Sequence, residues 1–149
     1  MRRFLGAVAI TLAALPAFAS DDDIIRLRAG ADVPATMDRL EAAVSGAGAT
    51  VFARVDHAAG AASVDMTLAP SQLLIFGNPK MGTAAMQDDP RAGLFLPLRV
   101  LVYEDAGGQV WIAYKDPEDM FDDLSIDDDA PYIKMMAGAL AKLTASAAQ

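Results

Sequence analysis

The spacing of apolar and polar residues predicts a series of short strands separated by helices. Apolar residues alternate with polar ones, or β-branched and aromatic residues dominate, over residues 24–29, 50–57, 63–68, 98–103 and 109–114. The last two segments flank Gly107 and Gly108, which can adopt positive φ and so predict a hairpin. A further segment, 73–76, is apolar without alternation, which is typical of a strand covered on both faces.

Two longer helices are predicted from apolar residues that recur at helical spacing. The first spans residues 34–46, with Asp32 as its capping candidate. The second has its apolar residues over 133–143, with Asp129 as capping candidate and Pro131 in its first turn. Shorter helices are predicted over residues 83–87 and after Asp116, where a proline and two acids suit a first turn.

This order of elements predicts an α+β fold, with helices packed on one face of a mainly antiparallel sheet. Residues 58–62, AAGAA, fit a loop and a turn of helix equally well. No repeat or linker divides the chain, and about 130 residues suffice for one compact core. We therefore expect a single domain over residues 20–149.

The N-terminal residues predict export. Arg2 and Arg3 precede an apolar segment, 5–15, and the small residues of AFA suit cleavage after Ala19. We expect a signal peptide over residues 1–19 and a periplasmic mature domain, by the general or the twin-Arg route. The apolar segment is shorter than the roughly 20 residues that span a bilayer, which disfavours an uncleaved anchor.

The charge and the absence of cysteine exclude several classes of partner. The sequence has 12 basic and 20 acidic residues, and loss of Arg2 and Arg3 leaves a charge of 10 − 20 = −10. Such a surface repels phosphate groups, so we expect no nucleic-acid partner and no membrane partner after signal cleavage. With no Cys, the chain can form no disulfide and perform no thiol chemistry.

A glycine-containing turn follows the apolar segment 73–76 and first suggests a phosphate loop. A phosphate loop needs Lys directly after its second Gly, whereas Lys80 precedes Gly82 here, and Pro79 removes one N–H from the cradle. A sharp strand exit at Gly77 and Asn78, with a helix beginning near Gly82, explains the pattern better. Lys80 beside a helix N-terminus could still hold a carboxylate or another small anion.

The pair Asp56-His57 is the second candidate for chemistry, because His57 is the only His. An imidazole titrates near neutrality and suits acid–base work. Neighbouring strand residues point to opposite faces, so Asp56 is not expected to orient His57. A buried structural histidine and a catalytic one both stay open, although no G-x-S-x-G nucleophile motif exists.

Neither metal nor cofactor is expected. One His and no Cys exclude the usual zinc sites. Thioethers favour Cu(I), but no Met-x-x-Met array supports a copper site among His57, Met66, Met81, Met86, Met135 and Met136. Eight carboxylates between Asp116 and Asp129 lack the glycine of a calcium loop, and helix capping explains them better.

Several segments taken together resemble a known bacterial family. They are VDHAAGA, QLLIFGNPKMGTAAM, DPRAGLFLPLRVLVYED and a strand that ends in AYKDP. This combination resembles the family named domain of unknown function 302. The resemblance implies a small α+β domain with a curved antiparallel sheet of TBP-like outline, self-association as a homodimer, and no established activity. The signature residues would be Asp56, His57, Phe76, Gly77, Asn78, Pro79, Gly82, Leu96 and Pro97.

Three functions stay open from the sequence. The first is a periplasmic binding or accessory module for a small ligand, in one version anionic, held by Asp56, His57, Gly77, Asn78, Pro79, Lys80 and Gly82. The second is a hydrolase-like enzyme that uses His57 as general acid or base. The third is a structural or oligomerising protein. The binding module ranks first, and it requires His57 to lie close to the Gly77–Gly82 turn.

Overall fold

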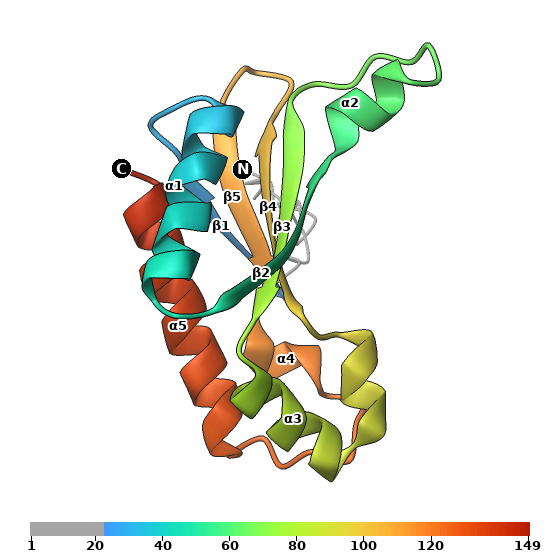
Figure 1. Cartoon of the computed structure of the whole chain (residues 1–149), viewed down its shortest axis with the longest axis vertical. Helices are drawn as coiled ribbons and strands as arrows, with labels where there is room; N and C mark the ends of the chain where they lie inside the picture. Colours follow the sequence, from blue (N-terminus) through green and yellow to red (C-terminus); the bar gives the residue numbers. More distant parts are fainter. Residues whose placement is uncertain (1–22) are drawn as a thin grey trace, which may run out of the picture.

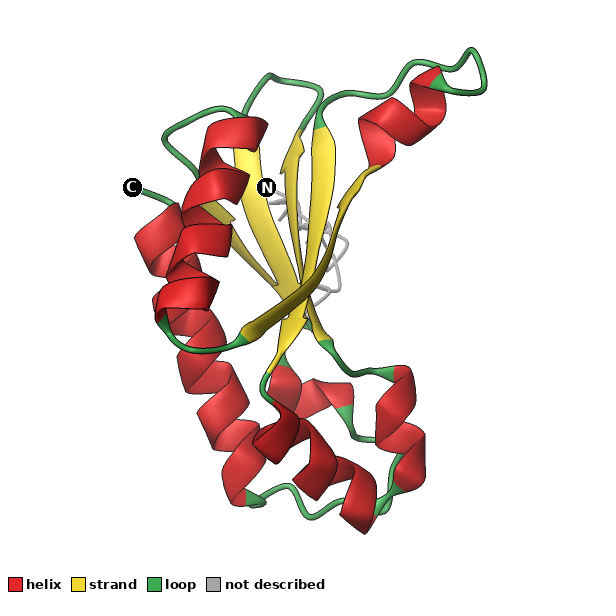
Figure 2. Ribbon diagram, viewed as in Figure 1, coloured by secondary structure: helices red, strands yellow, loops and turns green. Residues whose placement is uncertain are grey.

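The computed structural model describes residues 23–149, so the predicted signal peptide lies outside the described residues. The domain is a five-stranded antiparallel sheet in the order β1-β5-β4-β3-β2, with two long helices across one face (Figures 1 and 2). The strands are β1 (Ile24–Arg28), β2 (Thr50–Asp56), β3 (Ser71–Gly77), β4 (Leu98–Glu104) and β5 (Val110–Lys115). The helices are α1 (Val33–Gly46), α2 (His57–Ala62), α3 (Pro79–Asp88), the 3-10 helix η1 (Pro90–Leu94), α4 (Pro117–Met120) and α5 (Pro131–Ala147). The predicted α+β class, antiparallel sheet and hairpin are confirmed.

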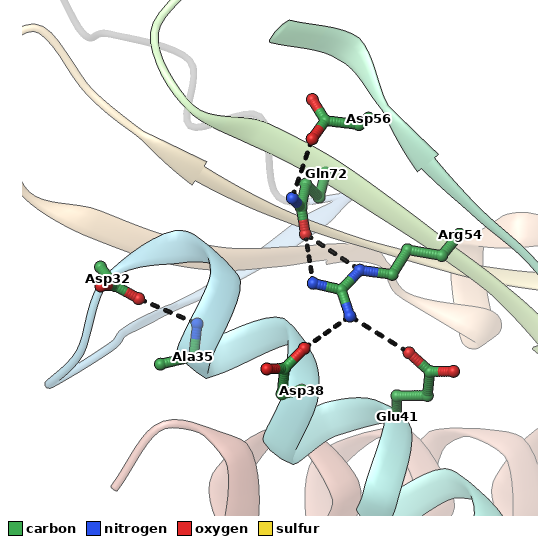
Figure 3. Close-up of polar contacts among 7 residues, drawn as sticks. All are labelled: Asp32, Ala35, Asp38, Glu41, Arg54, Asp56 and Gln72. Atoms are coloured by element: carbon green, nitrogen blue, oxygen red, sulfur yellow. Dashed lines mark hydrogen bonds and ion pairs between the residues drawn. The ribbon is translucent and has the colours of Figure 1, made fainter. Parts of the chain in front are cut away.

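The core lies between the sheet and the helices α1 and α5. On the helix-facing side the strand register pairs Leu74 with Val100 and Val102 with Ile112, and all four are fully buried. Met37 and Leu40 of α1 and a stripe of α5 pack against this row. The Asp32 carboxylate caps α1 by accepting a hydrogen bond from the Ala35 N–H at 2.9 Å (Figure 3).

The other side of the sheet, here called the outer sheet face, combines apolar and cationic side chains. The register places on it Arg26, Arg28, Leu73, Ile75, Arg99, Leu101, Tyr103 and Trp111. The guanidinium groups of Arg26 and Arg28 lie 5.1 and 5.3 Å from the centre of the Trp111 ring. Cation–π attraction therefore holds two positive charges close to the Trp111 ring.

Residues 63–68 were predicted as a strand, and that prediction is wrong. They form a turn and an extended loop after α2, because β2 pairs with β3 and no strand adjoins this segment. The ambiguous residues 58–62 are helical. The Asp56 carboxylate accepts a hydrogen bond from the Ala59 N–H at 2.9 Å and so ends β2 and starts α2.

Two helix starts differ from the sequence-based expectation. Helix α3 begins at Pro79, not near Gly82 or residue 83, because the Asn78 side chain accepts a hydrogen bond from the Lys80 N–H at 3.0 Å. Helix α5 begins after Ala130 without a side-chain cap, and Asp129 instead pairs with Lys134 at 2.8 Å.

Candidate functional site

A pocket of about 250 Å³ opens at the end of the sheet where β3 ends and α3 begins. Strands β2, β3 and β4, helices α3 and α5, the 3-10 helix η1 and the segment that follows it all contribute to its wall. The lining residues are Phe52, Gly77, Asn78, Pro79, Met81, Gly82, Thr83, Met86, Gly93, Leu96, Pro97, Leu98 and Met136.

Two glycines and one strand irregularity leave room for this pocket. A Cβ at Gly77 would lie 3.5 Å from the Pro97 Cβ, and one at Gly82 would lie 3.7 Å from the Leu96 Cδ1. Phe52 lies where the β2–β3 register shifts, between Val51 and Ala53, and its side chain is 56% exposed. The bulge therefore directs an aromatic ring to the pocket that a regular ladder would not place there.

The chemistry of the lining is mainly apolar. Three thioethers, those of Met81, Met86 and Met136, are joined by aliphatic, proline and phenyl groups. The exceptions are the Asn78 amide and the Thr83 hydroxyl. Such a wall favours ligands that bury apolar surface, with few polar groups to orient them.

The N-terminus of α3 has no free donor in its first turn. Pro79 lacks an N–H, and the Lys80 N–H donates to the Asn78 side chain. The N–H groups of Met81 and Gly82 both donate to the Asn78 carbonyl oxygen at 3.1 Å. The helix terminus therefore has no spare N–H in that turn to hold an anion.

A buried carboxylate fixes the segment that forms the outer wall of the pocket. Asp89 accepts hydrogen bonds from the Arg91 guanidinium at 2.6 Å and from the Ser125 N–H at 3.0 Å. It thus joins η1 to the loop between α4 and α5. Hydrogen bonds from Arg91, and then from Ser125, hold the pKa of Asp89 well below its usual range.

Helix α5 is tied to the end of α3 nearby. The Tyr132 hydroxyl donates to the Asp88 carboxylate at 2.8 Å. Desolvation, together with this carboxylate, raises the pKa of Tyr132 to about 12. The phenol therefore stays protonated and keeps donating across the neutral range.

Asp56 and His57 lie at the other end of the sheet. In the β2–β3 ladder Thr50 faces Gly77, whereas Asp56 faces Gln72, so six residues separate the two sites along β2. At about 3.3 Å per residue the separation is roughly 20 Å. The expectation that His57 adjoins the Gly77–Gly82 turn is therefore wrong, and one pocket cannot hold both groups.

At that far end Asp56 has a structural role. Its carboxylate caps α2 and accepts a hydrogen bond from the Gln72 amide at 3.0 Å, while Gln72 also accepts from Arg54 (Figure 3). The Ala59 N–H, and then Gln72, lower the pKa of Asp56. Arg54 continues the network to Asp38 and Glu41 of α1, at 2.6 and 3.2 Å. His57 is exposed, and among residues 23–149 no hydrogen bond to its imidazole is formed.

Of the other residues that the sequence predicted for the site, four line the pocket and one does not. Gly77, Asn78, Pro79 and Gly82 line it, whereas the exposed Lys80 side chain does not. Of the nine residues that carry the family resemblance, six line the pocket: Gly77, Asn78, Pro79, Gly82, Leu96 and Pro97.

Comparison with known proteins now adds to this geometry. A model of the family described as "Domain of unknown function DUF302" matches residues 25–146. The chain belongs to the DUF302 family. A crystal structure of an uncharacterized conserved DUF302 protein from Bacillus stearothermophilus superimposes with a TM-score of 0.67 at 19% identity, covering 85% of this chain and 95% of the other. That likeness supports the fold alone.

Two curated relatives of this DUF302 domain are named for ion transport. "Fluoride-specific ion channel FluC 1" of Brucella suis biovar 1 and of Brucella abortus biovar 1 are each 42% identical over 97 residues, or 65% of this chain. The match covers 38% and 36% of those two proteins. Within residues 23–149 of the DUF302 domain, no helix is long and apolar enough to cross a bilayer.

The described residues of the DUF302 domain contain few side chains arranged as metal ligands. Residues 23–149 contain no group of three His or acidic side chains that could hold an ion. Of the methionines considered for Cu(I), Met81, Met86 and Met136 line the pocket, while Met66 and Met135 lie elsewhere.

Sequence reasoning missed most of the pocket wall. Phe52, Met86, Gly93 and Met136 come from four separate elements, and their apolar character reads as ordinary core or strand composition. The one usable signal was the pair Leu96-Pro97 in the family signature, which follows η1 and faces the Gly77 turn.

Proposed function

We propose that this DUF302 domain is a binding module for a small apolar ligand, held in the pocket between β3, α3 and η1. The supporting observation is an open pocket of about 250 Å³ whose wall is largely thioether, aliphatic and aromatic. Burying apolar surface stabilises a complex by about 0.8 kcal/mol per CH₂ group, so a ligand of several carbons gains useful affinity there.

The geometry favours an apolar ligand over an anionic one. The first-turn donors of α3 are used within the protein, and Lys80 does not line the pocket. The amide of Asn78 and the hydroxyl of Thr83 could orient one polar group of the ligand at the mouth. If the N-terminal segment is a cleaved signal peptide, this binding takes place in the periplasm.

Hydrolysis through His57 has weaker support. The imidazole is exposed, lies at the opposite end of β2 from the pocket, and has no hydrogen-bond partner within residues 23–149. A general base needs a partner or substrate within hydrogen-bond reach.

Filling the pocket tests the proposal. The change Gly82→Leu places a side chain in the lining of α3 and should weaken binding of the apolar fluorophore N-phenyl-1-naphthylamine at least about tenfold. The matched control is Gly138→Leu in α5, where a Cβ meets nothing within 4 Å. Both changes replace a helical glycine and each should stabilise its helix by about 1 kcal/mol. Equal loss of binding in both variants, or no binding by the unmodified protein, would contradict the proposal.

The relatives named as fluoride-specific channels support a second, related role. We propose that the domain acts beside a membrane channel in those proteins, since the shared segment is little more than a third of their length. By analogy this chain would serve a membrane partner as an accessory module. The fluoride conduction in their name is not proposed for this chain.

Free fluoride is not the expected ligand of the pocket. A small hydrated anion gains little from thioether and aliphatic groups, and the first-turn N–H groups of α3 are already paired. Adding millimolar sodium fluoride should leave fluorophore binding unchanged, and the ¹⁹F resonance of fluoride should keep its line width. Saturable displacement of the fluorophore by fluoride, with sodium chloride as the control, would show the opposite.

A further inference from the structure

An exposed arm projects from the sheet at the end opposite the pocket. The arm comprises residues 57–70, that is α2 and the loop that leads to β3 (Figure 1). None of its residues is buried, and three large apolar side chains face solvent: Val64 is 63% exposed, Met66 66% and Leu68 50%. Exposed apolar side chains grouped on one segment are characteristic of an interaction surface.

The arm is ordered by its own hydrogen bonds. The Met66 N–H donates to the Ala61 carbonyl at 3.0 Å, and the Asp65 N–H donates to Ala62 at 3.2 Å. Asp65 has a φ of 59°, a left-handed conformation that directs the following residues away from α2. The apolar side chains are therefore presented on a fixed loop, which lowers the entropic cost of docking.

The positions of arm and pocket suit a reciprocal exchange. The pocket lies by the Thr50–Gly77 pair and the arm leaves the sheet at the Asp56–Gln72 pair, roughly 20 Å away along β2. A two-fold axis perpendicular to the strands brings the arm of each copy to the pocket of the other. Such an interface is isologous and closes as a dimer, without open-ended growth.

We propose that the pocket of one copy receives the arm of a second copy, with the Met66 side chain in the lining between Met81 and Met86. This inference rests on the proposed function, because it requires a pocket that accepts apolar groups, and it adds that a ligand and the partner's arm compete. Ligand binding would then release the dimer. The charges of the two surfaces are complementary. Asp65 is the only acidic residue of the arm, whereas Lys80 is exposed beside the pocket and takes part in none of the ion pairs of residues 23–149.

Engineered cysteines test the contact directly, because the natural chain has no Cys. Thr67→Cys lies beside Met66 on the arm and Thr83→Cys lies in the lining of the pocket, and within one chain these sites are at opposite ends of the sheet. On non-reducing denaturing gels after mild oxidation, the double variant should run as a disulfide-linked dimer, while each single variant should run largely as a monomer. Absence of the linked dimer in the double variant, or equal linkage by Thr67→Cys alone, would overturn the exchange.

Sedimentation equilibrium provides the thermodynamic test. Met66→Asp should weaken self-association about tenfold or more, because a charge replaces a side chain that is buried only in the dimer. Met135→Asp, at an exposed position of α5, is the matched control and should leave self-association unchanged. Saturating N-phenyl-1-naphthylamine should also dissociate the unmodified dimer.

Failure of the exchange and failure of the binding function give different results. In one outcome, the natural protein is a monomer that binds the fluorophore as tightly as the Met66→Asp variant does. That result would overturn the exchange and leave the proposed binding function standing. A Met66→Asp variant that binds no fluorophore would remove the basis of both. Fluorophore binding that leaves the dimer intact would show that the arm docks elsewhere, which also overturns the exchange.

Discussion

Replacing Met136 with Ala is expected to lower the free energy of unfolding by about 2–5 kcal/mol. Met136 is 1% exposed on α5, and its side chain belongs both to the main core and to the floor of the pocket. Removing the thioether deletes apolar contacts and enlarges a space that the rigid sheet cannot close. Chemical denaturation followed by circular dichroism measures the change.

Met135 is the natural control, because it is the same residue type one position earlier and is 58% exposed. The Met135→Ala change should alter stability by less than about 0.5 kcal/mol. Similar losses in both variants would mean that α5 does not pack in this orientation. The larger cavity of Met136→Ala should also admit bulkier apolar probes than the natural pocket does.

Replacing Asp89 with Asn is expected to lower the melting temperature near pH 7 by an amount on the order of 5 °C. The neutral amide loses the charge-assisted pairing with Arg91 within η1 and weakens the hydrogen bond from the Ser125 N–H, which joins η1 to the loop between α4 and α5. Since η1 positions part of the pocket wall, affinity for the apolar fluorophore should fall as well. Thermal unfolding across a pH series measures the first effect.

The pH dependence identifies the cause. The pKa of Asp89 is lower in the folded protein than the value of about 3.9 in an unfolded chain. The ionised carboxylate therefore contributes its full share to the stability of the folded protein above pH 4–5. That contribution is lost as the pH falls further and the carboxylate becomes protonated. The difference in melting temperature between the natural protein and the Asp89→Asn variant should therefore become smaller below pH 4. The exposed Asp122→Asn serves as control, and a difference that stays constant down to pH 2 would exclude the proposed role.

The elements that the sequence predicted well are those whose signals are local. Asp32 caps α1, Gly107 and Gly108 connect β4 and β5, and Asp116 caps α4, each through a few neighbouring residues. The segment from Val64 to Leu68 has the same quality of local signal and yet forms no strand. Alternation indicates that one side of a segment needs covering, but it does not specify a neighbouring strand within the same chain.

The candidate site was predicted only in part, for a topological reason. Asn78, Pro79 and the two glycines do line a pocket, since tight strand exits create concave surfaces. The placement of His57 beside them was wrong because β2 and β3 are antiparallel neighbours. In that arrangement the end of β2 adjoins the start of β3, which is the opposite end from Gly77. Phe52 and Met136 reach the pocket through a bulge and through tertiary packing, neither of which leaves a spacing signal.

The position of Trp111 makes the protein its own reporter for one surface and not for another. It is the only Trp, the guanidinium groups of Arg26 and Arg28 lie close to its ring, and its indole N–H donates to Asp105 at 2.8 Å. Its emission should respond to any molecule that covers the outer sheet face and displaces these guanidinium groups. The same emission should not change when a ligand fills the pocket beside α3. A single spectrum can therefore tell which of the two surfaces a newly added compound or protein has reached.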